Sequence, residues 1–407
     1  MRTDVIVIGA GVVGLSVALT ARARGLTVTV VEREGPAAGA STGNAGAFAF
    51  TDILPLASPR IIRQAPKWLL DPLGPLSVPP AYALKIAPWM WRFWLASFPR
   101  QVAASTRVQT GMMRLSREAL LAFLDREGLT HFLRREGNLQ VYEGEGEFRA
   151  SLSGWQARDA EGIEYRHLKG DEIATIQPGL APRFTHATFT PGWWSVTDPR
   201  AYTLALAERL RDQGGRIEIA TALRLVPGGV ETSAGVMQAG KVVIAAGAHS
   251  HHLARTAGVK IPLETERGYN TTLPAGVFDL RTQVTFGGHG FVVTRIGDGI
   301  RVGGAVELGG LTLPPNYARA DAMLKKAANF LPGLKTTGGT QWMGFRPSLP
   351  DTLPAIGALK PMPDVICAFG HGHLGLTQSA GTAAIVADLL TGQTPGIDLA
   401  PLSPHRF

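Results

Sequence analysis

The segment Asp4–Glu32, DVIVIGAGVVGLSVALTARARGLTVTVVE, decides the fold of this chain. Its first apolar run, Val5–Ile8, predicts a buried strand, and the glycine motif GAGVVG at residues 9–14 follows at once. An Ala-rich stretch then predicts a helix, and a second β-branched run, Thr27–Val31, delivers Glu32. Strand, glycines, helix, strand and acid in this order are typical of a dinucleotide-binding βαβ unit; the alternative is an ordinary tight turn between strand and helix.

Each glycine of the motif has a separate physical role in such a unit. Gly9 permits the tight turn out of the strand, Gly11 lets the backbone approach a pyrophosphate, and Gly14 lets helix and sheet pack closely. The free N–H groups and positive dipole end of the helix favour phosphate, and no acidic residue lies near enough in the sequence to repel it. We expect the Glu32 carboxylate to accept hydrogen bonds from the ribose hydroxyls.

Composition indicates an ordered protein with a large core. The chain has 407 residues, 45% of them hydrophobic and 18% charged, which suggests two or more domains. Its single cysteine, Cys367, excludes an internal disulfide and fits a reducing compartment. We expect no signal peptide and no transmembrane helix. The net charge of +8 is scattered, which argues against nucleic-acid binding but is compatible with attraction to an anionic membrane surface.

Two segments after the opening unit are unusual. Residues 33–47, REGPAAGASTGNAGA, predict a loop whose small side chains let backbone and hydroxyls crowd a cofactor; a merely flexible loop is the alternative. Lys85–Pro99, KIAPWMWRFWLASFP, predicts a helix that is aromatic on nearly every face. Such a helix is either buried between domains or part of a surface that dips into the membrane interface or faces an electron acceptor.

The remaining pattern predicts two interleaved domains. An amphipathic helix spans residues 109–127, and short strands and turns follow from His131 to Trp194. A helix capped by Thr197 or Asp198 comes next, followed by a buried strand at 241–246. This strand is followed by glycine, as at the N-terminus, so we expect residues 196–258 to rejoin the first domain. Residues 264–310 suit an antiparallel sheet and 319–330 a helix. We therefore predict an α/β (overall α+β) fold. Its Rossmann-like dinucleotide-binding domain comprises residues 1–80, 196–258 and 342–407, and its antiparallel substrate domain comprises 81–195 and 259–341.

A second glycine motif, GHGHLG at residues 370–375, follows a strand and precedes a helix. Taken literally it would bind a second dinucleotide, but no β-branched strand with an acid follows that helix. The alternative is a helix N-terminus aimed at the far end of the first cofactor, where a reduced flavin carries negative charge. One adenosine-end motif and one redox-end helix together indicate FAD.

The sequence resembles the D-amino acid dehydrogenase branch of the FAD-dependent amine and amino acid oxidoreductases, the superfamily of glycine oxidase, sarcosine oxidase and D-amino acid oxidase. The similarity rests on VIGAGVVGLSVA, STGNAG, VTDPRAYTLALAERL, VVIAAGAHS, ERGYNTTLP, RVGGAVELGG, GFRPSLPDTLPAIG and FGHGHLGLTQSAGTAAIVADLLTG in this order. The resemblance implies a non-covalent FAD, since no attachment motif like that of the covalent-flavin relatives lies near Cys367. We expect no metal, because the histidines at 249–252 and 371–373 have no carboxylate or thiolate partners at ligand spacing.

The resemblance also implies roles for individual residues. Arg346 would grip the substrate carboxylate, Tyr269 would face the flavin from the substrate sheet, and His373 replaces a substrate-proximal arginine of glycine oxidase. The predicted catalytic residues are therefore Arg346, Tyr269 and His373. The predicted cofactor-binding residues are Gly9, Gly11, Val12, Val13, Gly14, Glu32, Arg33, Ser41, Asn44, Ala45, Gly46, Leu223, Gly247, Gly344, His371, Gly372, His373, Leu374, Gly375, Leu376 and Thr377.

The chemistry needs positioning more than it needs a nucleophile. Hydride leaves Cα of the neutral amino acid for flavin N5 and an imine forms, which water hydrolyses to a 2-oxo acid. A planar guanidinium, here Arg346, can hold the carboxylate bidentately. Glu266 or His289 could adjust amine protonation, and Trp193 and Trp194 either wall the pocket or pack in the core.

Three functions remain open from the sequence. The first is a dehydrogenase of D-amino acids, including cyclic or N-substituted ones such as D-proline types, that passes electrons to a quinone or another respiratory carrier. The others are an oxygen-using oxidase of the glycine or sarcosine type and a flavin-bearing subunit of a multi-protein amine dehydrogenase. We expect a cytoplasmic enzyme, either free or peripheral on the inner face of the cell membrane.

Overall fold

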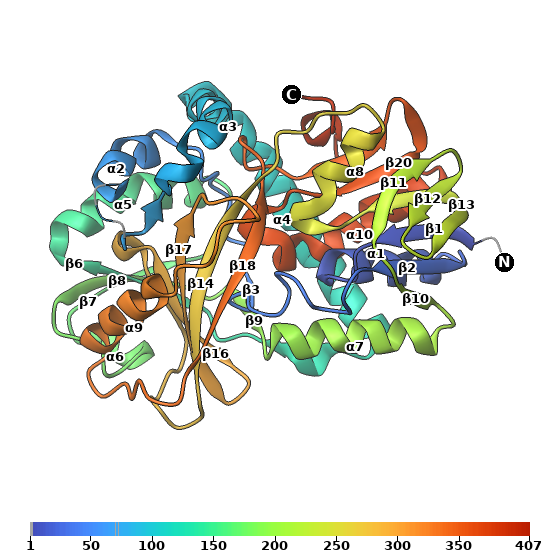
Figure 1. The fold of residues 1–407 in the computed structure, drawn as a ribbon. Coiled ribbons are helices and arrows are strands. Elements are labelled where there is room, and N and C mark those ends of the chain that lie inside the picture. The colour runs from blue at the N-terminus through green and yellow to red at the C-terminus, as the bar shows by residue number, and fades with distance from the viewer. Residues whose placement is uncertain (1–2, 70, 72) are drawn as a thin grey trace.

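Two β-sheets, each with its own hydrophobic core, dominate the computed structural model, which describes residues 3–69, 71 and 73–407 (Figure 1). The first sheet has a parallel centre in the order β10 (Arg216–Ile219), β2 (Val28–Glu32), β1 (Thr3–Ile8), β13 (Gly235–Ile244) and β20 (Met362–Phe369). Antiparallel strands complete it: β11 (Ala222–Val226) and β12 (Gly229–Thr232) beside β13, and β19 (Ala355–Leu359) beside β20.

Helices cover both faces of this first sheet. On one face lie α1 (Val12–Ala23), α4 (Pro99–Glu127), α7 (Pro199–Asp212) and α10 (Gly375–Thr391), and on the other lie α8 (Ser250–Thr256) and the β11–β12 hairpin. Val5 and Val7 of β1 pack into the first layer, whereas Ile6 and Ile8 pack into the second. A strand that is buried on both faces requires an unbroken apolar run, which the sequence supplies.

The second sheet is largely antiparallel. Its order is β18 (Thr340–Ser348), β14 (Glu264–Leu273), β17 (Gly299–Glu307), β16 (Phe291–Ile296), β15 (Gln283–Phe286), β6 (Asn138–Glu143), β8 (Phe184–Thr190) and β7 (Arg166–Lys169). The short β4 (Leu76–Ser77) pairs with β17. A small third sheet joins β3 (Ala47–Phe48), β9 (Trp194–Val196) and β5 (Leu133–Arg134).

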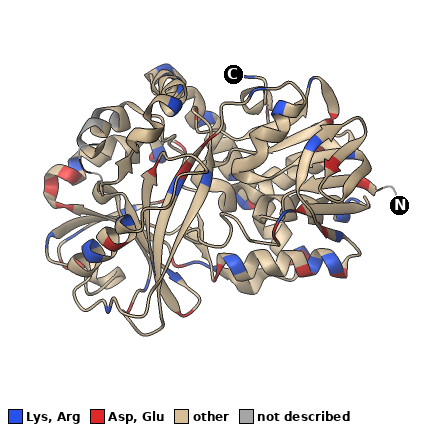
Figure 2. Ribbon diagram, in the orientation of Figure 1, with Lys and Arg blue, Asp and Glu red and all other residues tan. Residues whose placement is uncertain are grey.

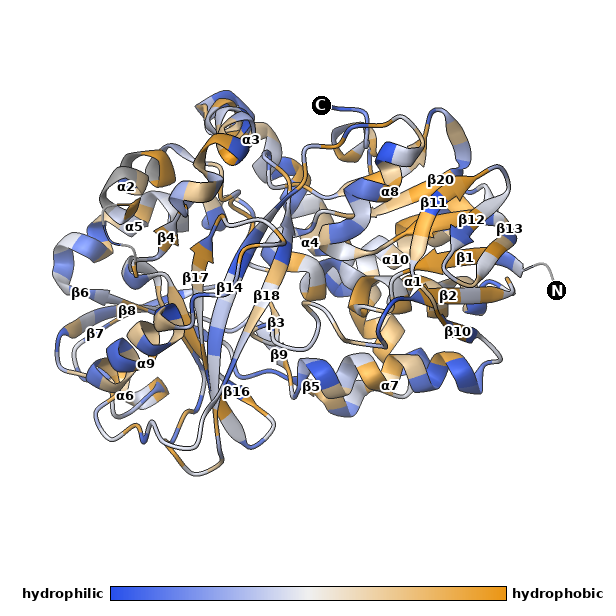
Figure 3. Cartoon of the chain, in the orientation of Figure 1, coloured by the Kyte–Doolittle hydropathy of each residue, from blue (hydrophilic) through white to orange (hydrophobic). Residues whose placement is uncertain are grey.

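The other helices surround the second sheet (Figure 1). They are α2 (Pro59–Leu69), α3 (Ala83–Ala96), α5 (Gly144–Asp159), α6 (Glu172–Ile176) and α9 (Ala318–Phe330). Helix α9 packs on β14 and β17, and α3 stands at the outer rim of the molecule. Hydrophobic residues concentrate in β1 and β20 of the first sheet, whereas β14 of the second sheet is largely hydrophilic (Figure 3).

The predicted α/β class is confirmed, and so is the return of the chain to the first sheet, where β13 inserts beside β1. Asp198 is the cap of α7, because its carboxylate accepts hydrogen bonds from the amides of Arg200 and Ala201. The division into two domains stays a prediction. Its border at residue 342 falls inside β18, which pairs with β14 along its whole length and therefore lies in the second sheet.

Two helices differ from the sequence prediction. Helix α4 starts at Pro99 instead of residue 109, because Pro99 occupies the first helical turn, where its missing N–H costs nothing. Helix α5 lies where only strands and turns were expected. Its sequence, GEGEFRASLSGWQARD, is glycine-rich and weakly amphipathic, and the packing of Trp155, whose indole donates to the Tyr142 hydroxyl, fixes it in place.

Candidate active site

One continuous cavity of about 950 Å³ runs from the carboxyl ends of the first sheet to the face of the second. The glycine turn after β1, the end of β2 and the loop around Leu223 line its first part. The N-terminus of α10 and the strands β14, β17 and β18 line its other end. Both glycine motifs of the sequence therefore face one elongated site, which is the arrangement expected for a single dinucleotide.

The glycine turn divides its tasks as expected. Gly9 has φ of +111°, and a Cβ on it would lie 2.4 Å from the Ala245 carbonyl oxygen. A Cβ on Gly14 would lie 2.0 Å from the Gly9 carbonyl oxygen, so this residue serves packing of helix on strand. At Gly11 a Cβ would meet only the Ser41 hydroxyl, at 3.2 Å, and would otherwise fill the open cradle at the start of α1. No acidic side chain lies in the first turn of α1, so the cradle fits a pyrophosphate.

Glu32 closes the first part of the cavity. Its carboxylate accepts hydrogen bonds from the amide of Ala10 at 2.8 Å and the amide of Glu34 at 3.1 Å. These bonds hold the acid at the end of β2, beside Arg33 and near Leu223, which also line the cavity. The position suits a carboxylate that accepts ribose hydroxyls.

The loop after β2 is fastened to the second sheet. The Asn270 side chain donates to the carbonyl of Gly43 at 2.7 Å, and the Arg301 guanidinium donates to that of Asn44 at 2.6 Å. The Trp342 ring lies so close to Gly43 that a Cβ there would come within 2.2 Å of it. Burial lowers the pKa of Arg301 to about 10, although the charge of Asp198 opposes this. Sequence analysis missed these residues, because only the pairing of β14, β17 and β18 brings them to the loop.

The start of α10 bounds the far end of the cavity. Thr377 ties it to the opening loop, because its hydroxyl accepts from the amide of Ala49 at 3.0 Å and donates to the carbonyl of Ala47 at 3.2 Å. The backbone from Gly372 to Leu376 lines the cavity above this contact. The free amides of a helix start near this wall suit the electron-rich end of a flavin.

Most of the predicted cofactor residues meet at this cavity. They are Gly9, Gly11, Val12, Val13, Glu32, Arg33, Ser41, Asn44, Ala45, Leu223, Gly247, Gly344, His371, Gly372, His373, Leu374, Gly375 and Leu376. Gly14, Gly46 and Thr377 lie behind the wall and support it. Trp193 lines the cavity, whereas Trp194 packs in the core against Phe50.

Arg346 projects from β18 over a floor of glycine. A Cβ on Gly268 would lie 2.4 Å from one guanidinium nitrogen, so only glycine leaves room for this side chain. The other terminal nitrogen donates to the Ala305 carbonyl at 3.0 Å. Burial lowers the pKa of Arg346, and the charge of Glu266 opposes this shift. Because a guanidinium is not deprotonated in proteins, Arg346 faces the cavity as a cation with donors to spare.

Glu266 is the neighbour of Arg346 across the β14–β18 pair. Its side chain is only 5% exposed and lines the same cavity. Among the residues that the structure describes, none makes a hydrogen bond or an ion pair with its carboxylate. His289, the other candidate for adjusting amine protonation, is bound to Glu143 at 2.8 Å and does not line the cavity.

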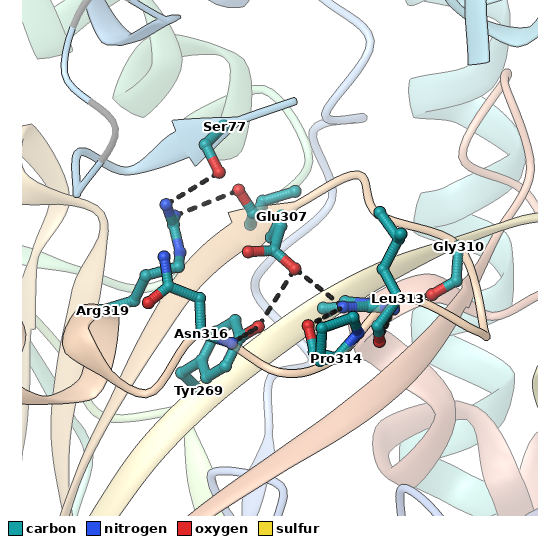
Figure 4. Close-up of polar contacts among 10 residues, drawn as sticks. Ser77, Tyr269, Glu307, Gly310, Leu313, Pro314, Asn316 and Arg319 are labelled. Carbon is teal, nitrogen blue, oxygen red and sulfur yellow. Dashed lines mark hydrogen bonds and ion pairs between the residues drawn. The ribbon is translucent and has the colours of Figure 1, made fainter. Parts of the chain in front are cut away.

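Tyr269 lines the cavity, but the protein already uses its hydroxyl (Figure 4). The hydroxyl donates to Glu307 and accepts from the amide of Asn316, both at 3.0 Å. Burial raises the pKa of Tyr269, and the charge of Glu307 adds to this. Glu307 also pairs with the fully buried Arg267, which donates to the carbonyls of Gly310, Leu313 and Pro314. This network braces residues 308–317 behind the site.

His373 lies at the cavity wall beside Asp52, at 3.2 Å, and Asp52 also contacts Arg158 at 3.3 Å. Burial alone would raise the pKa of Asp52, but His373 and Arg158 outweigh it and leave the pKa below its usual value. The chain thus brings Arg346, Tyr269 and His373 to one cavity, with His373 held by a carboxylate from the opening segment.

His371 gives the site a pH-dependent stability. It is buried, it contacts the Thr382 hydroxyl at 2.9 Å, and burial lowers its pKa to about 4. Between about pH 6.5 and pH 4, His371 is protonated in the unfolded chain but remains neutral in the folded chain. The folded state therefore loses stability as the pH falls through this window. We expect His371→Gln to remove up to about 3 kcal/mol of that loss.

Urea unfolding of the FAD-loaded protein at pH 7 and at pH 5 measures the effect. His131→Gln, at an exposed histidine, is the matched control and should keep the pH dependence of the parent. Equal losses of stability in the parent and in His371→Gln would contradict the assignment.

The fold and this cavity define an FAD-dependent oxidoreductase. The sequence matches the family described as FAD dependent oxidoreductase over residues 4–389, and the chain belongs to that family, as predicted. FAD is its cofactor, and the elongated cavity with its glycine cradle fits such a dinucleotide.

Individual relatives agree with the family match. A protein of Bradyrhizobium diazoefficiens named D-amino-acid oxidase is 34% identical over 417 residues, which cover 99% of this chain and 98% of its own. A protein of Sinorhizobium medicae named D-amino acid dehydrogenase is 32% identical over 415 residues, 99% of each chain.

Solved structures share the fold. Glycine oxidase from Geobacillus kaustophilus superimposes with a TM-score of 0.77 at 22% identity, covering 100% of this chain and 99% of its own. L-proline dehydrogenase from P. horikoshii superimposes with a TM-score of 0.76 at 20% identity, and the superposition covers 100% of this chain and 98% of the dehydrogenase.

Proposed function

We propose that the chain oxidises D-amino acids to imines, which hydrolyse to 2-oxo acids, and passes the electrons to a quinone or another carrier. The observation that carries the proposal is the Arg346–Glu266 pair, a cation and an anion side by side above glycine at the flavin-facing end of the cavity. An amino acid presents the complementary pair, a carboxylate and an ammonium group, on one carbon. The names of the relatives in Bradyrhizobium and Sinorhizobium support the same substrate class.

Each side chain has a distinct task in this proposal. FAD, held non-covalently by the residues of the cavity, would supply the acceptor for the hydride of the substrate Cα. Arg346 binds the carboxylate, and its hydrogen bond to Ala305 keeps the guanidinium in one orientation. Glu266 binds the ammonium and accepts the proton that must leave nitrogen before the imine can form. Tyr269 forms the wall beside them, and His373, held by Asp52, also lines the cavity.

The residues that line the cavity also indicate what kind of side chain the substrate carries. Beyond Arg346 it is lined by the apolar residues Leu56, Ile61, Ile62, Trp68, Leu76, Trp89, Met90, Phe93 and Leu308. These residues favour a substrate with an apolar side chain, and cyclic D-proline types belong to that class. Dye reduction by purified protein with a panel of D-, L- and N-substituted amino acids tests substrate class and handedness together.

Glu266→Gln tests the ammonium site, because the substitution keeps the shape and removes the charge. We expect KM for the amino acid to rise about tenfold to a hundredfold, as for loss of a charged hydrogen bond. A carboxylate without an amine, such as propionate, should bind equally well or more tightly, since the negative charge beside Arg346 is gone. Steady-state kinetics with a dye acceptor measure KM for the amino acid, and flavin absorbance during titration measures the binding of propionate.

The control for this substitution is Glu264→Gln, on the same strand. Glu264 accepts a hydrogen bond from the Tyr82 hydroxyl at 2.8 Å and does not line the cavity. Its loss should leave KM unchanged. Parallel weakening of amino acid and propionate in Glu266→Gln would assign Glu266 a merely structural role.

The relative named D-amino-acid oxidase makes dioxygen the second candidate acceptor. Stopped-flow mixing of the reduced enzyme with air-saturated buffer distinguishes the two acceptors. Reoxidation too slow to sustain turnover supports the dehydrogenase, and reoxidation at the rate of turnover assigns an oxidase. A carrier dissolved in the membrane would require the protein to bind peripherally at the bilayer surface.

A further inference from the structure

The outward face of α3 is apolar, aromatic and uncovered. Leu84, Trp91 and Leu95 follow one another at intervals of seven and four residues, which aligns them on one side of the helix, and Phe98 lies just beyond its end, before α4. Their exposed fractions are 92%, 59%, 42% and 44%. Trp94, 39% exposed, joins them by stacking on Trp91 and contacting Phe98 edge-on, with both centroid distances 4.9 Å. Of the two alternatives for residues 85–99, burial between domains is therefore wrong for the outer face of this helix.

The opposite face of the same helix is buried. Trp89 and Phe93 stack at 5.2 Å, and together with Met90 they form the wall of the apolar end of the active-site cavity. The outward aromatic side chains are therefore not needed for packing of the fold, and a single helix separates them from the cavity. Exposed aromatic patches of this kind mark interaction sites.

The segment that carries this face has charges of one sign. Between Asp71 and Glu118 the sequence contains no acidic residue, and its charged residues there are Lys85, Arg92, Arg100, Arg107, Arg114 and Arg117. Lys85, Arg92, Arg100 and Arg107 are exposed. In Figure 2 the α3 helix carries blue segments and no red one. A surface that combines tryptophan, leucine and basic residues complements an anionic phospholipid bilayer, where rings lie at the headgroup level and cations meet phosphate.

We propose that α3 and the start of α4 form a peripheral binding surface for anionic lipid bilayers, with Leu84, Trp91, Trp94, Leu95 and Phe98 inserted among the headgroups. Within the described residues, none of the helices combines the length and apolar character needed to cross a bilayer, so the contact is interfacial. This orientation turns the apolar end of the cavity toward the membrane. The proposal concerns lipid binding and does not depend on the substrate of the enzyme.

Co-sedimentation of the FAD-loaded protein with vesicles tests it. The protein should sediment with vesicles that contain phosphatidylglycerol, sediment less at high salt, and stay in solution with pure phosphatidylcholine. The double variant Trp91→Ser/Trp94→Ser should bind the anionic vesicles about tenfold more weakly or worse. Unchanged FAD content and melting temperature would show that it remains folded. Ile219→Ser/Val236→Ser, at exposed apolar residues of the first sheet, is the matched control and should bind like the parent.

A second variant tests the charge. Lys85→Gln/Arg92→Gln keeps the aromatic face and should weaken binding to anionic vesicles about fivefold for each charge removed. Absence of binding by the parent, or equal binding by the parent and the double tryptophan variant, would overturn the proposal. So would a parent dimer that the tryptophan substitutions convert to a monomer without any change in vesicle binding, since the face would then be a contact between copies of the chain.

Discussion

Arg346→Ala should retain FAD and lose most of its activity, with kcat/KM about a hundredfold to a thousandfold lower. The loss follows from the removal of a buried cation that pairs with the substrate carboxylate, an interaction for which truncation of one partner costs about 2–5 kcal/mol. The variant also leaves Glu266 without its neighbouring positive charge across the strand pair. Steady-state kinetics with a dye acceptor, combined with the ratio of flavin to protein absorbance, measures activity and cofactor content separately.

Arg346→Lys is the matched variant. Lysine keeps the charge but not the planar pair of donors, so we expect an intermediate loss if bidentate contact matters. Near-normal kinetics of Arg346→Ala would show that another residue holds the carboxylate. Arg301 is the first alternative to examine, although its guanidinium already donates to Asn44.

Gly11→Val should leave a folded but colourless protein, with FAD affinity lower by about a hundredfold. At Gly11 a side chain would point into the pyrophosphate cradle and meet only the Ser41 hydroxyl, so the fold can accept what the cofactor cannot. Reconstitution with FAD, followed by quenching of flavin fluorescence, gives the affinity. The far-ultraviolet circular dichroism spectrum reports the fold.

Two glycine controls make this result specific. Gly111→Ala, in α4 with nothing within 4 Å of the added Cβ, should change neither fold nor FAD content. Gly14→Ala should destabilise the protein itself, because its Cβ would overlap the Gly9 carbonyl oxygen. Full FAD binding by Gly11→Val would contradict the assignment of the cradle.

The parts of the site that were predictable are local in sequence. The turn at residues 9–14 and the start of α10 each consist of a strand, a turn and a helix start next to one another, and Glu32 ends the strand that follows α1, so short-range rules set their geometry. The same holds for the Asp198 cap and the strands that flank it.

The parts that were missed depend on contacts between distant segments. Asn270 and Arg301 reach the opening loop only because β14 and β17 pair in one register, which no local pattern encodes. Glu266 could be named as a titratable residue, but its position opposite Arg346 follows from the pairing of β14 with β18. The aromatic composition of α3 was evident from the sequence. Which of its rings are buried depends on the segments that pack against it in the folded chain.

The first sheet inserts β13 next to β1 and β20 next to β13, and α10 lies against α1. During synthesis β1 and α1 therefore leave the ribosome before the elements that cover them exist. Strand β13 comes from more than halfway along the chain, and α10 comes from its last tenth. A nascent chain still held by the ribosome exposes the apolar faces of β1 and α1, so we expect it to need protection by a chaperone until translation ends. Loading of the flavin belongs, on this topology, to the completed polypeptide.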